Sequence, residues 1–195
     1  MKDNRILGIG LALAAAACLI YASVTRHWLV NSSRFEEIGF GLRDNYQCAS
    51  LTEGHPECQE QTNSAFIEKW QDVGDTASQF ASGVFAPMGW ATLVECLLAA
   101  LGLVAAAALA LANKQPQLPI TPSTLGLLGV MATLITGMIF VAKKPGPPGF
   151  VGVGISFWVF GAGAVLGIAG AQMLAKVNRP KDPDLLEDAM NPDQF

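Results

Sequence analysis

The stretch ILGIGLALAAAACLIYASVT, residues Ile6–Thr25, contains no charged side chain over 20 residues. An α-helix rises about 1.5 Å per residue, so about 20 residues cross the ~30 Å hydrocarbon core of a bilayer. The stretch therefore predicts a membrane-spanning helix. A cleaved signal peptide is the alternative, with Lys2 and Arg5 as its basic start, but the apolar core of a signal peptide usually holds about 7–15 residues.

The composition of the whole chain agrees with several such spans. Hydrophobic residues make up 51% and charged residues 14% of the sequence, whereas a soluble domain has about 25% charged residues. The charges are clustered and leave long apolar gaps, which is typical of membrane spans. A net charge of −4 and the lack of a Lys/Arg stripe with interleaved aromatics argue against a nucleic-acid partner.

A polar segment, residues 26–86, separates the first apolar run from the next. It is too long for an idle connection and too rich in aromatic side chains to remain unfolded. Its first half predicts strands, because apolar Phe40 and Leu42 alternate with glycine and arginine over residues 39–43, and the turn residues Asp44 and Asn45 follow. Cys48 and Cys58 predict a disulfide, since paired cysteines in a loop on an oxidising face usually oxidise. With His55 as the one nearby histidine, they make a poor zinc site, and we expect no metal and no cofactor.

The second half of the polar segment predicts a helix over Asn63–Ser82. Apolar residues recur there at spacings of three and four, Asn63 is a candidate N-cap, and Gly74 marks a place where the helix bends or breaks. The apolar stripe either packs on the sheet or lies at the lipid interface with Trp70 as its anchor.

Three more apolar runs complete the predicted fold class, an all-α membrane protein. We expect a four-helix transmembrane bundle with a small disulfide-tied extracellular β-sheet plus a helix between the first and second spans. The segments are a cytoplasmic terminus with the first span over 1–25, the extracytoplasmic domain over 26–86, the second span over 87–112, a cytoplasmic turn over 113–123, the third span over 124–142, a short outer turn over 143–149, the fourth span over 150–175 and a disordered cytoplasmic tail over 176–195.

The distribution of basic residues predicts that both termini are cytoplasmic. Lys and Arg near the spans number six on the predicted inner side and two on the outer side, and such a bias marks the cytoplasmic face. The expected location is the plasma membrane or a bacterial inner membrane. The inner residues are Lys2, Arg5, Lys114, Lys176, Arg179 and Lys181, and the outer ones are Lys143 and Lys144.

Small residues provide the expected contacts between helices. Lipid tails are as apolar as leucine, so spans associate through close packing of small residues. Gly163 and Gly167 form one small-residue groove in the fourth span, and Gly129 and Gly137 lie on one face of the third. These rows serve either packing within one chain or self-association with a second copy.

Glu95 is the one acidic residue inside an apolar run. A carboxylate in the membrane suggests a function by default, such as carrying a proton, binding an ion or pairing with another subunit. The alternative is a carboxyl group satisfied by a neighbouring hydrogen-bond donor, for which Thr136, Ser156 and Gln172 are the candidates.

The order of residues in the polar segment resembles the claudin and peripheral-myelin-protein superfamily of four-span proteins. That family has a Trp, then Gly-Leu-Trp, then two cysteines, and Trp28, Gly41, Leu42, Cys48 and Cys58 stand here in that order. Arg43 occupies the position of the second Trp, and four residues separate it from Cys48. The resemblance implies a disulfide-tied antiparallel sheet followed by a helix.

The resemblance also implies a non-enzymatic role in protein–protein interaction, in adhesion or a barrier, or as an auxiliary subunit. Another membrane protein or a second copy would bind the first outer loop, in which Trp28 and Leu42 are expected to pack the sheet onto the bundle. Two alternatives stay open. Glu95 could handle a proton or cation in a small transport or energy-complex subunit, or Cys48 and Cys58 could cycle as a thiol oxidase.

Overall fold

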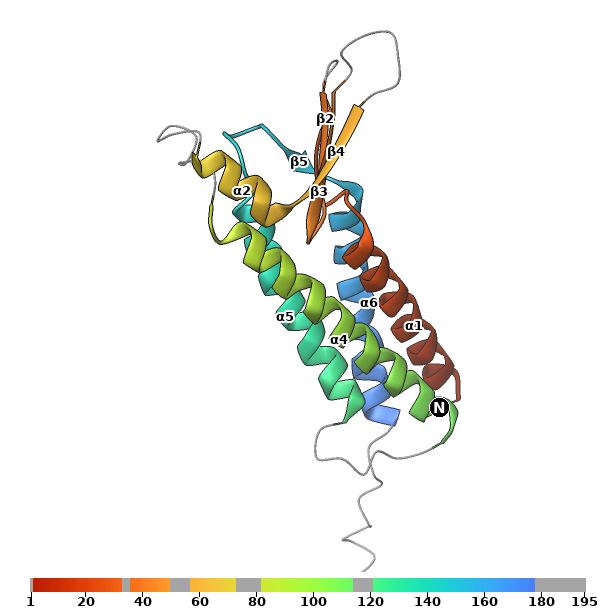
Figure 1. The fold of residues 1–195 in the computed structure, drawn as a ribbon. Coiled ribbons are helices and arrows are strands. Elements are labelled where there is room, and N and C mark those ends of the chain that lie inside the picture. Colours follow the sequence, from red (N-terminus) through yellow and green to blue (C-terminus); the bar gives the residue numbers. More distant parts are fainter. Residues whose placement is uncertain (1, 33–35, 50–56, 73–81, 114–120, 178–195) are drawn as a thin grey trace, which may run out of the picture.

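Long helices lie side by side in a bundle, and a small sheet stands at one end of it (Figure 1). The computed structural model describes residues 2–32, 36–49, 57–72, 82–113 and 121–177. Among these residues, four helices are long and apolar enough to cross a membrane. They are α1 (Lys2–Val24), α4 (Phe85–Leu111), α5 (Pro122–Ala142) and α6 (Ile155–Val177).

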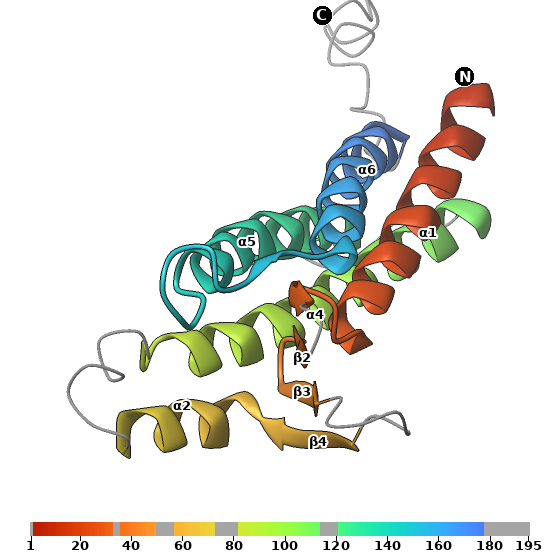
Figure 2. The same cartoon turned by 90° about the horizontal axis from the view of Figure 1, so that it is seen from above.

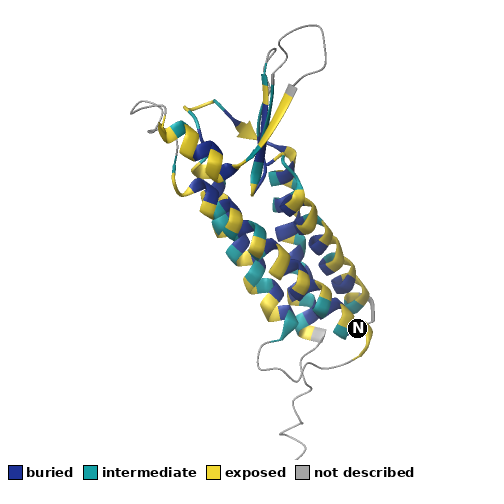
Figure 3. Ribbon diagram, viewed as in Figure 1, coloured by how far each residue is buried: buried dark blue, intermediate teal, exposed yellow. Residues whose placement is uncertain are grey.

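The outward faces of these helices are apolar, as the sequence predicts for a bundle in lipid. Large hydrophobic side chains are exposed on every helix, among them Leu101 and Ile135, each 63% exposed. Figure 3 marks the buried positions, and in these helices most of them are alanine and other small residues. A bundle with small residues inside and large apolar residues outside suits a lipid environment, where close packing joins the helices.

Glycines set how closely the helices approach. A Cβ atom at Gly102 would lie 2.7 Å from the backbone nitrogen of Gly126, and one at Gly170 would lie 2.7 Å from that of Ala12. The four glycines predicted to pack helices all meet neighbouring helices of the same chain. A Cβ atom at Gly163 would approach Cys18, and one at Gly167 would approach Val130. At Gly129 the neighbour is Ala99, and at Gly137 it is Phe160.

Within the described residues, the sheet has five antiparallel strands in the order β4-β3-β2-β1-β5. Four of them come from the predicted polar domain and confirm the sheet expected there. They are β1 (Leu29–Ser32), β2 (Glu36–Phe40), β3 (Asp44–Ala49) and β4 (Glu57–Thr62). The disulfide joins Cys48 and Cys58, which stand directly opposite each other in β3 and β4.

The fifth strand corrects the expected start of the fourth span. Gly152–Val153 forms β5 and pairs with Val30 and Leu29 of β1, and α6 begins only at Ile155. Both residues of this strand are exposed. Hydrophobicity alone does not distinguish a short apolar strand from the start of a helix, so the apolar run from Phe150 does not show where the strand ends and the helix begins. The third and fourth long helices are thus linked through an edge of the sheet.

The helix after β4, α2 (Asn63–Asp72), lies beside the beginning of α4 (Figure 2). Its predicted N-cap is wrong. The hydroxyl of Thr62 accepts a hydrogen bond from the backbone of Ala65 at 3.2 Å, whereas the Asn63 amide donates to the carbonyl of Gly41 at 2.9 Å. Asn63 is fully buried, so a tertiary contact has taken its side chain away from the cap.

The other expectations for this region are partly outside the described residues. The helix was expected to reach Ser82, which is not helical, and residues 73–81 with Gly74 are not described, nor is the tail over 178–195 or the connection over 114–120. The apolar stripe packs inward, as one of the two interpretations proposed. Phe66 and Ile67 are buried, and Trp70 lies 5.4 Å from the ring of Phe66 and 5.7 Å from that of Phe150.

A chain of aromatic rings joins the sheet to the bundle. Phe40 of β2 lies 5.7 Å from Phe85 of α4, which stacks on Phe140 of α5 at 4.4 Å. Trp28 then contacts Phe140 at 5.8 Å and Phe160 of α6 at 4.9 Å. All five side chains are buried. Aromatic pairs at such distances contribute about 0.5–1.5 kcal/mol each beyond their burial, so the sheet and bundle are held together as one body.

Candidate functional site

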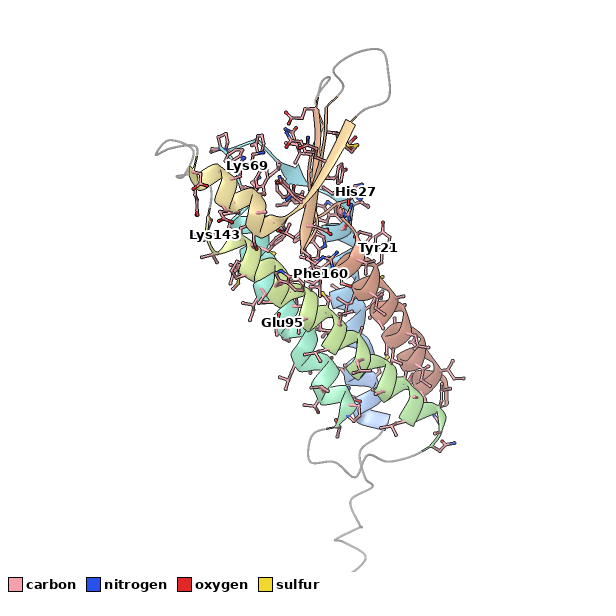
Figure 4. The ribbon with its side chains drawn as sticks, viewed as in Figure 1. Tyr21, His27, Lys69, Glu95, Lys143 and Phe160 are labelled. Carbon is pink, nitrogen blue, oxygen red and sulfur yellow. A yellow bond between two sulfur atoms is a disulfide. The ribbon has the colours of Figure 1, made fainter. Side chains whose placement is uncertain are left out.

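An open groove lies where the sheet meets the end of α1. Its volume is about 470 Å³, and its walls include the disulfide and the side chains of Arg26, His27, Tyr46 and Glu60. The register of β3 and β4 creates it: Tyr46 faces Glu60, and Cys48 faces Cys58. Residues directly opposite in a sheet, and those two apart along a strand, share one face. His27 is seen at this junction in Figure 4.

Arg26 connects three elements of the groove. It follows α1, and its guanidinium donates to both carboxylate oxygens of Asp44 in β3, at 3.1 and 3.4 Å, and to Glu60 in β4. The hydrogen bond to Glu60, together with the charge of Asp44, raises the pKa of Arg26 above its already high ordinary value. The fork geometry fixes the side chain, although a partly exposed ion pair adds only about 0–1 kcal/mol to stability.

Tyr46 lies across the same face of the sheet. Its ring covers Gly39 of β2, where an added Cβ atom would be 2.2 Å from the ring. The phenol donates a hydrogen bond of 2.8 Å to the carboxylate of Glu37, and His27 stands edge-on to the ring at 5.9 Å. Burial, with the contribution of Glu37, raises the pKa of Tyr46 to about 12. The phenol therefore stays a hydrogen-bond donor throughout the physiological pH range.

The electrostatic balance of this face is negative. Glu37, Asp44 and Glu60 bring three carboxylates to it, against two guanidinium groups, one from Arg26 and one from Arg43, which donates to Asp44 at 3.1 Å. Aromatic and disulfide surfaces lie between them. The groove can therefore accept a cationic or hydrogen-bonding side chain and pack its apolar stem. Among the described residues, His, Cys, Asp and Glu side chains do not gather in threes that could hold a metal ion.

Of the residues predicted from the family motif, Cys48 and Cys58 line the groove, and Trp28, Gly41 and Leu42 lie where the sheet meets the bundle. Trp28 is fully buried, and its indole N–H donates to the carbonyl of Ala22 at 2.6 Å. Gly41 begins the turn between β2 and β3, with its N–H donating to the carbonyl of Asp44 at 2.8 Å. Leu42 in that turn is buried, and its carbonyl rests against Gly89 of α4, where a Cβ atom would be 2.0 Å away. Trp28 and Leu42 therefore join the strands and their turn to the helices of the bundle.

Glu95 lies apart from this groove, on the side of the bundle (Figure 4). It is the eleventh residue of α4, so it lies about 15 Å along the helix from the sheet end. The hydroxyl of Thr136 in α5 donates a hydrogen bond of 2.6 Å to its carboxyl group. Of the three donors suggested by the sequence, Thr136 is therefore the partner.

Sequence reasoning missed the polar members of the groove. Arg26, Asp44, Tyr46 and Glu60 are separated along the chain by up to 34 residues, and only the strand register brings them together. One signal was present: the spacing of two among Asp44, Tyr46 and Cys48 puts them on one face of a strand. The partner positions on β4 follow once the disulfide fixes the register.

Comparison with known proteins adds no assignment. No protein-family model matches the chain, and no curated protein sequence matches it either.

Proposed function

We propose that this is a multi-pass membrane protein without enzymatic activity that binds another protein through the groove. The four apolar helices would cross the bilayer, and the disulfide-tied sheet would stand on the extracytoplasmic side with both termini in the cytoplasm. The partner would be another membrane protein or a second copy, in the same or a facing membrane. This is the interaction role implied by the claudin resemblance, in adhesion, in a barrier or in a membrane complex.

The groove is the observation that carries the proposal. It is open, and it combines charged walls with aromatic surface. The buried chain of aromatic rings that joins the sheet to the bundle holds it rigidly. Rigid, amphipathic surfaces bind with little loss of conformational freedom. Residues 26–87 hold nine acidic and four basic residues, a net charge of −5. Charge complementarity therefore favours a partner that brings a basic side chain to the groove.

Photo-crosslinking in native membranes tests the proposal. A photo-crosslinking amino acid replaces His27 in the groove, and in a second protein it replaces Lys69, which is exposed on α2. We expect a discrete protein adduct from position 27 and none from position 69. Two differently tagged copies in the same cells then show whether the captured chain is the protein itself.

Matched charge variants make the test specific. Glu60→Gln removes a carboxylate from the groove, and Glu68→Gln removes one from the exposed surface of α2. Glu60→Gln and added salt should each lower the adduct yield at position 27. Glu68→Gln should leave this yield unchanged. Equal adduct yields at positions 27 and 69 would contradict binding through the groove. A yield at position 27 that changes neither with Glu60→Gln nor with salt would contradict it as well.

A second function rests on Glu95. A carboxyl group about 15 Å into an apolar helix is costly in a membrane and is commonly functional there, and its hydrogen bond with Thr136 gives it a defined position. We propose as the alternative a small transport or energy-complex subunit in which Glu95 carries a proton or cation. In proteoliposomes, Glu95→Gln should then abolish ion flux while leaving thermal stability and crosslinking from position 27 unchanged. Equal flux with and without the substitution would eliminate this alternative.

A further inference from the structure

The end of the bundle opposite the sheet contains a cavity between the start of α5 and the end of α6. Its volume is about 200 Å³. Leu127, Ala171 and Ala175 provide apolar walls, while Ser123, Gln172 and Lys176 provide polar ones. A cavity that is mostly apolar with a few convergent polar groups is the usual form of a ligand site. An amphipathic ligand suits this one best.

The polar part of the cavity is the N-terminus of α5. Pro122 occupies the first turn, and the hydroxyl of Thr121 accepts the backbone N–H of Thr124 at 3.2 Å. The N–H of Ser123 has no partner within the helix, because the first N–H groups of an α-helix lack a preceding carbonyl. The helix dipole adds about half a positive charge at this end. Both features favour an anion.

Ser123 gives the second, independent observation. Ser123 is one of the residues that line the cavity, it is 2% exposed, and its buried hydroxyl has no hydrogen-bond partner in the described part of the chain. A buried hydroxyl without a partner is costly, at about 1–3 kcal/mol, so such groups in proteins are normally satisfied. An acceptor oxygen placed in the cavity would satisfy this one.

Lys176 provides the full positive charge. It lies in the last turn of α6 and lines the cavity with an exposed side chain. The C-terminal carbonyl groups of α6 carry a partial negative charge of about the same size as the partial positive charge of α5, so the net positive charge near the cavity comes from Lys176. The residues that line the cavity therefore include a cation, a hydroxyl donor and the first turn of a helix.

We propose that this cavity binds a phosphate group, with the headgroup of a membrane phospholipid as the source. Phosphate at a helix N-terminus with a nearby lysine is a favoured arrangement, and the apolar walls would accept the first carbons of the acyl chains. The site lies at the end of four apolar helices, which is where a bilayer would present its headgroups. This inference relies on the membrane location proposed above but not on the partner of the groove.

Lipid retention by the full-length protein tests the site. The protein is purified in a non-ionic detergent and titrated with dioleoylphosphatidylglycerol, or with dioleoylglycerol, which has the same tails without phosphate. Native mass spectrometry measures the bound fraction. We expect retention of the phospholipid and not of dioleoylglycerol. Inorganic phosphate is added in a further arm: competition would identify free phosphate as a ligand of the same site, and its absence would assign the site to the lipid.

Two substitutions and one control locate the binding. Lys176→Gln should weaken retention about fivefold, as expected for one lysine near a phospholipid surface. Ser123→Ala should weaken it about tenfold through loss of one hydrogen bond to a charged group, with thermal stability unchanged or raised because an unsatisfied hydroxyl is removed. Lys143 lies at the opposite end of α5 from Ser123 (Figure 4), so Lys143→Gln should not change lipid retention.

The results that would overturn the phosphate site differ from those that would overturn protein binding through the groove. Equal retention of the two lipids, or variants at Ser123 and Lys176 that retain phospholipid as well as the Lys143→Gln control, would show that no phosphate site exists here. Either result would leave crosslinking from position 27 untouched. Should Ser123→Ala fail to fold, the comparison of Lys176→Gln with Lys143→Gln still decides the matter.

Discussion

Replacement of Trp28 should loosen the sheet from the bundle more than any other single aromatic change. Trp28 is fully buried, donates a hydrogen bond to the Ala22 carbonyl, and contacts the rings of Phe140 and Phe160. Trp28→Ala should cost about 3–5 kcal/mol, as for other buried aromatics. Trp28→Phe keeps a ring but loses the indole donor, so it should cost about 2 kcal/mol, of which the hydrogen bond accounts for about 1.

The native thiols of the protein supply the assay. Cys48 and Cys58 are bonded and Cys96 is buried, so a Cys18→Ala background leaves one free thiol that reacts with a fluorescent maleimide only on unfolding. The apparent melting temperature should fall by roughly 10 °C for Trp28→Ala, given about 2–4 °C per kcal/mol at this chain length. Trp158, 66% exposed on α6, is the control, and Trp158→Ala should change little. Equal effects at the two tryptophans would refute the role of Trp28 as the anchor.

Two further predictions use the same protein. Gly89→Ala places a Cβ atom 2.0 Å from the Leu42 carbonyl and should destabilise the protein by at least about 1–3 kcal/mol. Gly10→Ala meets nothing within 4 Å and should stabilise the protein by up to about 1 kcal/mol through helix propensity. In the thiol assay the two substitutions should therefore shift the apparent melting temperature in opposite directions. Tyr46 has its pKa raised to about 12, so its protonated form contributes stability that is fully present below the ordinary tyrosine pKa of about 10 and is lost as the pH rises toward about 12. Ultraviolet titration of the tyrosinate in a Tyr21→Phe background, which leaves Tyr46 as the one tyrosine, should show this late ionisation, and Glu37→Gln should bring it to lower pH.

The long helices could be predicted from the sequence because apolar length is a local property. The apolar runs that start at Ile6, Pro87, Thr124 and Phe150 form helices whose ends lie within a few residues of the predicted ones, except at the start of the fourth. The strands, too, follow from alternation and turn residues in the polar segment. The disulfide between Cys48 and Cys58 follows from their number and setting.

The remaining features depend on contacts between distant parts of the chain. Gly152–Val153 became a strand because the edge of β1 offered it hydrogen bonds, and no local pattern marks that. Asn63 gave up the cap position because the buried carbonyl of Gly41 needed a donor. The acidic and basic walls of the groove were brought together by the register of β3 and β4, which hydrophobicity does not encode.

A labelling experiment addresses the central claim, that the four helices cross a membrane and hold the sheet on its outer side. In a background without Cys18 and Cys96, Ser64→Cys places a thiol on the exposed start of α2, and Ala112→Cys places one at the exposed far end of α4. A membrane-impermeant maleimide added to intact cells should label position 64 at once and position 112 only after the membrane is permeabilised. Labelling of both positions in intact cells, or of position 112 alone, would contradict the account.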